Sequence, residues 1–480
     1  MSELLLSMMV VQLSTRFRWV FCQLETLRRC LPPSIRRTLE ELPESLDETY
    51  ERVLREIKKP NRDMAHRLLQ CLVVAIRPLR VQELAEVFAV DFDAGEGTAR
   101  LNLSWRWEDH EQALLSSCSS LISIVENVAV DSDAHSDPGV NSHSGKVEIQ
   151  NDGSLVVQFS HFSVKEFLTS PRLASPSRDV SHYHITLEPA HTIMAQACLG
   201  ILLRLDDGVE ENESGNSSPL ARYAARHWVA HAQFQNVSPR IQIAIERLFD
   251  PDKPYFVAWL GLYNMDYERR SSPFYLFTSS PTSHATPLYY ASLCGFQDLV
   301  EHLIAKYPHQ VKADGGFCRT PALAALEGRH FELADLLHRN GSSVDLRGFS
   351  SQTPLYSAAY QGDLEMVQVL LAYKVDVNSR SVSGSTPLIT ASYEVRPQTL
   401  HVIRLLLENG ANPNVRNDLG GTPLHGASYH GDLEVVRLLL KYGADVEPED
   451  KIGRTPFQTA SAYGHHEVAT LLLDQGARRI

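Results

Sequence analysis

A glycine-containing stretch that ends in a lysine is the first candidate for catalytic chemistry, because phosphate-binding loops share that composition. Gly139 precedes Gly145 and Lys146 at a spacing close to that of a nucleotide-binding P-loop. The spacing is one residue too long, and Val147 stands where a serine or threonine would hold Mg²⁺. The surrounding residues are polar and indicate a loop. We therefore predict no cofactor-binding residue here.

Side chains of the types that metal ions favour occur close together at His182, His184, Glu188 and His191. Pro189 is expected to break any common helical face among them. The segment is therefore interpreted as a surface loop that leads into a helix, and we predict no metal-binding residue.

A serine and a histidine lie close together at His161 and Ser163, which raises the possibility of a hydrolase. No G-x-S-x-G elbow or orienting acid accompanies them. We expect both side chains to cap a helix that starts near Val164. No catalytic residue is predicted anywhere in the chain.

Tyrosines recur at one position of a repeated motif. Tyr360, Tyr393 and Tyr429 each follow a pair of small residues, and Tyr463 lies one position later. At about 10 Å per repeat, the usual spacing of packed helices, they would form a column of rings. Tyrosine is favoured at binding hot spots. The alternative is that the rings only fill the space between repeats.

A Thr-Pro-Leu-like tripeptide marks the start of the helices that position these rings. It recurs about every 33 residues, at Thr286, Thr320, Thr353, Thr386, Thr422 and Thr455. Each copy precedes a helix of small residues and then an apolar helix. Threonine can cap the first helix, and proline suits its first position. A period of 33 with T-P-L-H-x-A is the ankyrin pattern. We predict six ankyrin repeats over 286–480, forming an α-solenoid whose concave groove binds another macromolecule.

Several residues of the repeats carry further predictions. The loops between repeats should form fingers, and Arg380, Arg416 and Asn417 on them are candidate partner-binding residues; a solvated edge explains them equally well. The second helices should end at left-handed glycines, which are Gly341, Gly410, Gly443 and Gly476.

Two repeats depart from the pattern. In the second repeat Arg329 replaces the glycine of its sisters, with Gly328 one place early, so we expect this repeat to be the weakest. The fourth interval is three residues longer because Glu394–Thr399 replaces a tight turn, and Pro397 should open that junction.

Composition excludes some classes of function. The 480 residues carry a formal net charge of −13, which argues against binding bulk nucleic acid or anionic membranes. Seven scattered cysteines without a CxxC motif indicate reduced thiols and a cytoplasmic location. The apolar start of the chain is too short to span a bilayer and is interpreted as part of a helix.

The first 280 residues lack the repeated motif and have a different pattern of apolar positions. Apolar positions at helical spacing predict helices over 18–30, 34–56, 62–76 and 81–89, and later over 187–205, 219–234, 239–249 and 255–263. Two strand-like runs lie at 121–125 and 154–159, and a loop is expected over 206–218. We divide this region into a helical segment (1–60), a winged-helix-like domain (61–170), a helical domain (171–263) and a linker (264–285).

A winged helix raises the hypothesis of DNA binding. The candidate reading helix, 81–89, carries Glu83 and Glu86 and no basic residue, which would repel phosphate. We therefore expect this helix to serve packing.

Four segments, 17–29, 42–54, 77–85 and 157–168, resemble the region after the NTPase core of fungal NACHT–ankyrin proteins. The resemblance implies a relation to NLR-like signalling NTPases, in which C-terminal repeats control a nucleotide switch. The family's P-loop would precede Arg18, and no such sequence is present, so ATPase activity is not carried over.

The sequence therefore predicts a mainly α-helical, non-catalytic scaffold for protein–protein interaction and signalling. Helical and winged-helix parts precede the ankyrin solenoid, and the expected partners are proteins, without nucleic acid, membrane or cofactor. A fragment of a nucleotide-regulated NLR-like NTPase is the alternative; a DNA-binding regulator is a more distant one.

Overall fold

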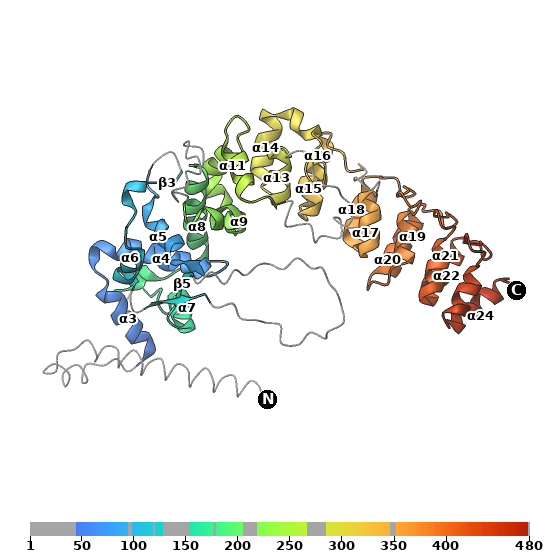
Figure 1. Cartoon of the computed structure of the whole chain (residues 1–480), viewed down its shortest axis with the longest axis horizontal. Helices are drawn as coiled ribbons and strands as arrows, with labels where there is room; N and C mark the ends of the chain where they lie inside the picture. The colour runs from blue at the N-terminus through green and yellow to red at the C-terminus, as the bar shows by residue number, and fades with distance from the viewer. Residues whose placement is uncertain are drawn as a thin grey trace. The chain divides into compact units, whose positions relative to one another are not determined.

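The computed structural model describes residues 45–94, 98–118, 121–127, 154–175, 179–204, 218–265, 285–345 and 352–478. The chain divides into two compact units, Met1–Tyr263 and Asn264–Ile480 (Figure 1). The predicted helix over 18–30, the P-loop-like residues Gly139–Lys146, and almost all of the loop over 206–218 and of the linker lie outside the described residues.

The first unit is mainly helical. Its helices are α3 (Leu46–Glu56), α4 (Arg62–Val74), α5 (Val81–Glu86), α6 (His110–Cys118), α7 (Phe162–Thr169), α8 (Leu187–Leu202), α9 (Ala221–Ala232), α10 (Gln242–Leu248) and α11 (Tyr255–Leu262). Short 3₁₀ turns are η2 (Lys59–Asn61), η3 (Val87–Ala89), η4 (Leu103–Trp105), η5 (Ser181–Tyr183) and η6 (Ser238–Ile241). The predicted helices over 62–76 and 81–89 are confirmed as α4 and as α5 continued by η3.

A three-stranded antiparallel sheet contacts helix α5 through two of its strands. It consists of β1 (Leu79–Arg80), β4 (Ile122–Glu126) and β5 (Leu155–Phe159), in the order β1-β5-β4. Val157 is opposite Leu79 on one side and Ile124 on the other. Both predicted strands are confirmed. The third was missed because two residues are too few to show an alternating pattern. A separate pair, β2 (Val90–Asp91) and β3 (Arg100–Leu101), forms a small hairpin.

Helices α8 to α11 surround an aromatic core. Trp228 and Trp259 are both fully buried, with ring centroids 5.6 Å apart, and Phe249 lies 5.5 Å from Trp259. The indole N–H of Trp259 donates to the carbonyl oxygen of Ala225 at 2.9 Å, so its polar edge is satisfied. Helix α8 also packs against α4, which joins the two halves of this unit.

The second unit is a row of six helix pairs. The pairs are α13 (Pro287–Cys294) with α14 (Gln297–Lys306), α15 (Pro321–Glu327) with α16 (Phe331–Arg339), α17 (Pro354–Gln361) with α18 (Leu364–Ala372), α19 (Pro387–Ser392) with α20 (Thr399–Glu408), α21 (Pro423–His430) with α22 (Leu433–Lys441), and α23 (Pro456–Ala462) with α24 (His466–Asp474). A 3₁₀ turn, η9 (Pro308–Lys312), follows the first pair. In the last four pairs the first helices pack on one another, α17 on α19, α19 on α21 and α21 on α23. Figure 1 shows α17, α19 and α21 in this order along the row.

The repeated threonine caps the first helix of every pair, as the sequence predicts. Its hydroxyl accepts a hydrogen bond from the backbone N–H three residues later, for example 3.2 Å at Thr353 and 3.3 Å at Thr386. The following proline occupies the first helical position in all six. The tripeptide therefore specifies each helix start through local contacts alone.

The predicted glycines end the second helices in the left-handed region, with φ of 98° at Gly341 and 83° at Gly443. The second repeat solves its own turn differently. Arg329 adopts φ 64° without being glycine, whereas Gly328 has φ −74°. A Cβ on Gly328 would lie 2.6 Å from the carbonyl oxygen of Leu293, so that glycine is required by close approach.

The longer fourth interval is closed by its own hydrogen bonds. The hydroxyl of Thr399 donates to the carbonyl oxygen of Glu394 at 3.2 Å and accepts from the N–H of Arg396 at 3.0 Å. The inserted residues therefore form a defined loop between α19 and α20.

Candidate functional site

A groove of about 430 Å³ runs along the first helices of the last four repeats. Its aromatic lining is Tyr356, Tyr360, Tyr393, Tyr429 and Tyr463, and its other lining residues are Ser385, Ile389, Thr390, Glu394, Asn417, Leu419, Gly421, His425, Asp450, Arg454 and Thr459. The four tyrosines singled out from the sequence therefore lie along one groove, together with Asn417.

The tyrosine rings differ in what they touch. Tyr429 and Tyr463 meet edge to face, with centroids 4.4 Å apart. Tyr393 lies against the next repeat: a Cβ on Gly426 would lie 2.7 Å from its Cδ2, and one on Gly421 2.7 Å from its hydroxyl. Burial raises the pKa of Tyr393 to about 12. Part of the predicted column thus fills space between repeats, while 40% of Tyr429 and 50% of Tyr463 remain exposed.

Tyr360, the first ring of the series, lies near a cation. The guanidinium of Arg396 is 5.9 Å from the centre of its ring, within the range of a cation–π contact. Arg396 also pairs with Glu394 at 3.4 Å, so the loop after α19 closes over this end of the groove lining.

The finger arginines link successive repeats. Arg380 donates to the carbonyl oxygen of Arg416 at 2.7 Å, and Arg416 donates to that of Glu449 at 3.0 Å. The side-chain amides of Asn378 and Asn414 also donate to the next repeat, to the carbonyl oxygens of Gly410 and Gly443 respectively. Arg380 and Arg416 therefore hold the fingers in register, a contribution the sequence did not suggest.

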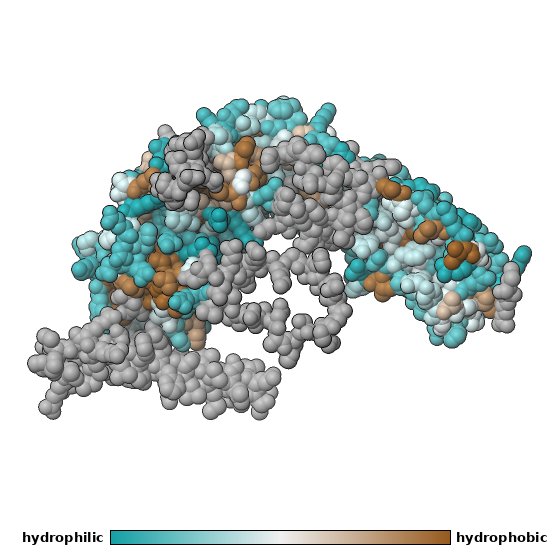
Figure 2. Space-filling view, viewed as in Figure 1, coloured by the Kyte–Doolittle hydropathy of each residue, from teal (hydrophilic) through white to brown (hydrophobic). Residues whose placement is uncertain are grey.

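Aliphatic side chains stand exposed on three of the fingers. Val382, Leu419 and Ile452 are 71%, 73% and 72% exposed. The space-filling view shows separate apolar patches over this part of the second unit (Figure 2). Adjacent fingers are joined by backbone hydrogen bonds, from Asp418 to Ser383 and from Lys451 to Leu419, both 3.0 Å.

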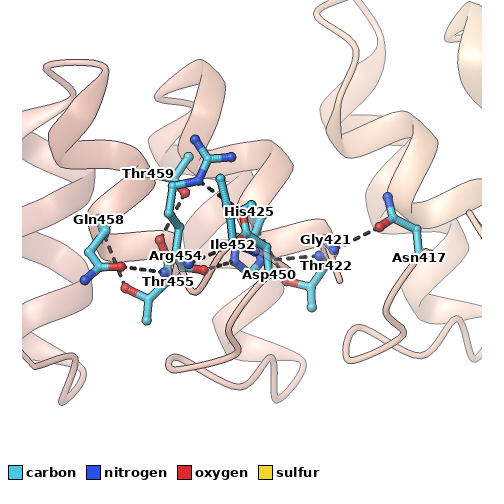
Figure 3. Close-up of polar contacts among 10 residues, drawn as sticks. All are labelled: Asn417, Gly421, Thr422, His425, Asp450, Ile452, Arg454, Thr455, Gln458 and Thr459. Carbon is cyan, nitrogen blue, oxygen red and sulfur yellow. Dashed lines mark hydrogen bonds and ion pairs between the residues drawn. The ribbon is translucent and has the colours of Figure 1, made fainter. Parts of the chain in front are cut away.

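Asn417 and Asp450 close the last two finger turns in the same way (Figure 3). The side-chain oxygen of Asn417 accepts from the N–H groups of Leu419 and Gly421, at 3.0 and 2.9 Å. Asp450 accepts from the N–H groups of Ile452 and Arg454, at 3.0 and 2.8 Å. Burial alone would raise the pKa of Asp450, but these bonds and the Arg454 guanidinium hold it below its ordinary value.

His425 is a groove residue that sequence reasoning missed, although its place in T-P-L-H was visible. Its Nδ1 accepts from the N–H of Thr422 at 3.2 Å, so its Nε2–H donates to the carbonyl oxygen of Arg454 at 3.0 Å (Figure 3). Burial lowers its pKa. The imidazole is therefore neutral and committed on both nitrogens, which leaves it no proton to exchange with a ligand.

The structure places His161 and Ser163 at the start of α7, where the sequence predicted a cap. His161 Nδ1 accepts from the N–H of Ser163 at 3.3 Å and lies 2.7 Å from its hydroxyl, which also meets the hydroxyl of Tyr50 at 2.8 Å. The helix begins two residues earlier than predicted, at Phe162. The pair is therefore part of a cap and of the contact between α3 and α7.

The histidines of the metal hypothesis are dispersed. His182 packs on Tyr183, Glu188 pairs with Arg240, and His191 stacks on Phe234. Over the described residues no cluster of three metal-ligating side chains occurs.

The prediction that Pro189 breaks the helical face was wrong. Pro189 does not break a helix but lies in the first turn of α8, where the backbone N–H needs no intrahelical partner.

A buried hydrogen-bond chain runs inward from His191. Its Nδ1 lies 2.9 Å from Nδ1 of His231, whose Nε2 lies 2.9 Å from the hydroxyl of Tyr223. The Tyr223 oxygen also accepts from the N–H of Ile76 at 3.2 Å. Two facing ring nitrogens can share only one proton, so at most one of the two rings donates across this contact. Burial, reinforced by His191, lowers the pKa of His231 to about 3.

We therefore expect the first unit to lose stability as the pH falls below 6.5, because unfolding lets His231 take up a proton. Above pH 6.5 the imidazole is neutral in both states and its contribution is fully present; it is lost progressively down to about pH 3. The slope due to His231 approaches about 1.4 kcal/mol per pH unit once the pH is well below 6.5, and it is smaller nearer to pH 7.

Urea unfolding followed by tryptophan fluorescence between pH 7 and pH 5.5 measures this slope. His231→Gln should reduce it, whereas replacement of the exposed His302 on α14 should not. Equal slopes for the two variants would contradict the assignment.

Helix α5 does not present acid to solvent as predicted. Glu83 and Glu86 are both 3% exposed, and each is paired with an arginine, Arg77 and Arg106 respectively. The prediction that this helix serves packing agrees with its burial, but electrostatic repulsion of phosphate was the wrong reason. The sequence could not show it because Arg106 lies twenty residues from Glu86.

Comparison with known proteins identifies the repeats. Residues 321–417 and 395–479 match the family model described as "Ankyrin repeats (3 copies)". These residues therefore form ankyrin repeats; the first predicted repeat precedes the match and has the same cap and helix pair.

A curated relative aligns with a larger part of the chain. Over 315 aligned residues the chain is 29% identical to "Azaphilone pigments biosynthesis cluster protein L" of Monascus ruber. The alignment covers 64% of this chain. The chain spans about 61% of the length of that relative. Of the helices that the structure describes, none is both long and apolar enough to cross a lipid bilayer.

Proposed function

We propose that this chain is a non-catalytic interaction scaffold that binds a partner protein through the groove of its last four ankyrin repeats. The observation that carries the proposal is the alignment of Tyr360, Tyr393, Tyr429 and Tyr463 along one groove. Ankyrin stacks offer extended concave surfaces of this kind for binding. Tyrosine suits such a surface because it gives large, stiff contact area with a polar end.

The chemistry of the groove favours binding over turnover. His425 uses both ring nitrogens, and Asp450 is engaged by two backbone N–H groups and by Arg454 at 3.1 Å. General acid–base catalysis needs a group free to exchange a proton with the substrate. The polar lining is instead committed to holding the fingers.

We propose that the first unit contains a winged-helix-like module related to the post-NTPase region of NACHT proteins. Its elements run α4, β1, α5, α6, β4, β5, with the sheet order β1-β5-β4. Two of the segments that carry the resemblance, 77–85 and 157–168, pair through Leu79 and Val157. In that proposal the module transmits or scaffolds what the repeats bind, as part of a signalling assembly.

The cysteines support a reducing compartment such as the cytosol. Among the cysteines that the structure describes, Cys71, Cys118, Cys198 and Cys294 are buried, Cys318 is partly exposed, and none of the five is in a disulfide. Burial raises the pKa of Cys71 and Cys118 to about 12 and raises that of Cys198 as well. Free thiols without disulfides are typical of intracellular proteins.

Replacing Tyr393 and Tyr429 together by alanine should weaken partner binding about 30-fold or more, the loss expected when a hot spot is truncated. The full chain and this variant are used to capture proteins from native cytosol, and affinity for the captured partner is then measured. Tyr442→Ala is the matched control, because Tyr442 is as exposed as Tyr393, at 36%, but ends the outer helix α22.

Equal affinity of the double variant and the wild-type chain would end the assignment of this groove. Loss of binding in Tyr442→Ala to the same extent would mean that the outer helices, rather than the groove, carry the contact.

A further inference from the structure

Two tryptophans stand exposed side by side in the first unit. Trp105 ends the turn η4 and is 47% exposed, and Trp107 is 53% exposed. The unit's other described tryptophans, Trp228 and Trp259, are fully buried. Exposed indoles are costly, since burial of such a ring contributes on the order of 1.5–3 kcal/mol or more. Their exposure therefore calls for a structural cause and suggests a use.

Part of the cause is the residue between them. Arg106 has an extended backbone, and its guanidinium pairs with the buried carboxylate of Glu86. Glu86 also accepts from the hydroxyl of Ser218 at 2.8 Å and from the N–H of Leu220 at 3.2 Å. Successive side chains of an extended chain point to opposite sides. Because Arg106 is extended and its guanidinium is held by Glu86, the next side chain, Trp107, is directed away from Glu86. Trp105 is placed by the end of the turn η4.

The indoles line a shallow groove of about 580 Å³. Its other lining residues are Pro60, Asn61, Met64, Phe88, Ser104, Arg106 and Ser116. Arg106 is the charged residue among them, and its charge is engaged by Glu86. The lining thus combines aromatic and apolar side chains with the polar side chains of Asn61, Ser104 and Ser116. Grooves of this mixed kind can receive an extended segment or an anchoring side chain.

Acidic residues follow the indoles directly along the chain. Glu108, Asp109 and Glu111 are exposed at the start of α6, where Asp109 also accepts from the N–H of Gln112 at 2.9 Å. Lys58 and Lys59 come directly before Pro60 and are exposed, so the anionic rim is confined to the α6 side. Exposed carboxylates disfavour a nucleic acid or an anionic membrane at this rim.

We propose that this groove binds an arginine-bearing extended segment of a partner protein. The guanidinium lies over Trp105 or Trp107, and the carboxylates of Glu108 and Glu111 face it. Arginine stacks on indole faces and tryptophan is the best acceptor of cation–π contacts. The surface is separate from the tyrosine groove and does not depend on the function proposed for the repeats.

A peptide of alternating arginine and proline tests the proposal on the full chain, because proline keeps it extended. Titration is followed by tryptophan fluorescence and by calorimetry. We expect saturable binding, roughly tenfold weaker for the lysine–proline peptide and absent for the glutamate–proline peptide.

Variants locate the binding site. Trp105→Ala with Trp107→Ala should weaken binding of the arginine–proline peptide roughly tenfold or more. Glu108→Gln with Glu111→Gln keeps both indoles and should also weaken it. The charge-matched control is Asp298→Asn with Glu301→Gln, at the start of α14 in the other unit, which should leave affinity unchanged.

Three results would overturn the proposal. The first is no binding of the arginine–proline peptide up to roughly 1 mM, an affinity too weak to be specific. The second is equal loss in the Glu108/Glu111 variant and its control, which would mean attraction by net charge alone. The third is tighter binding of single-stranded DNA or of anionic phosphatidylserine vesicles, which would assign the indoles to a different class of partner.

Discussion

Replacing Arg106 by alanine is expected to destabilise the first unit by about 3–5 kcal/mol, the cost of leaving a buried carboxylate without its cation. Glu86 is 3% exposed, and its remaining partners are the hydroxyl of Ser218 and the N–H of Leu220. Neither carries a charge that could replace the guanidinium. Arg106 also holds the segment that carries Trp105 and Trp107, so its loss should free that segment.

Denaturant unfolding followed by tryptophan fluorescence measures this effect, because all five tryptophans of the chain precede residue 264. The matched control is Arg172→Ala. Its guanidinium pairs with Asp47 at 2.9 Å on the surface, where removing a pair costs about 0–1 kcal/mol. A loss for Arg106→Ala no larger than that of the control would contradict a buried ion pair at Glu86.

Truncating Leu439 to alanine is expected to destabilise the repeats by about 2–5 kcal/mol. Leu439 is fully buried on α22, between the helices of its own and the neighbouring repeats. In a solenoid each repeat touches only its neighbours, so the weakening should concentrate in α19 to α24 and not reach α13 and α14. Hydrogen exchange resolved by peptide measures both the size and the reach of the effect.

Leu419→Ala is the control for this variant. The same atoms are removed from a finger side chain that is 73% exposed, where changes stay within about 0.5 kcal/mol. Faster exchange in α13 and α14 equal to that in α21 to α24 would show that the stack unfolds as one cooperative body and not repeat by repeat.

Local features were the ones that the sequence could predict. The threonine caps, the prolines after them and the glycines such as Gly443 depend on contacts within three or four residues. For the same reason the cap at His161 was predictable. The two longer strands were found because each is a strand-like run of five residues.

Features that depend on distant partners were missed. The ion pair of Glu86 was not predicted, because its arginine lies twenty residues away along the chain. The links from Arg380 to Arg416 and from Arg416 to Glu449 join residues 36 and 33 positions apart. Composition and periodicity carry no information on such pairings. From the sequence alone, a finger residue that links two repeats therefore cannot be told from one that is available to a partner.

The tyrosine groove shows both situations at once. The period of the motif places Tyr393 and Tyr429 at the same position of successive helices, and this was visible in the sequence. The extent to which each ring packs against the next repeat was not visible in the sequence. For Tyr393 it depends on Gly426, which leaves room for the ring.

The thiols of the first unit have a practical consequence. Alkylating reagents attack the thiolate, and Cys71, Cys118 and Cys198 are kept protonated and shielded while their surroundings stay folded. Each becomes reactive only when the helices around it open. The rate at which each of these cysteines is alkylated therefore reports how often the structure around that position opens.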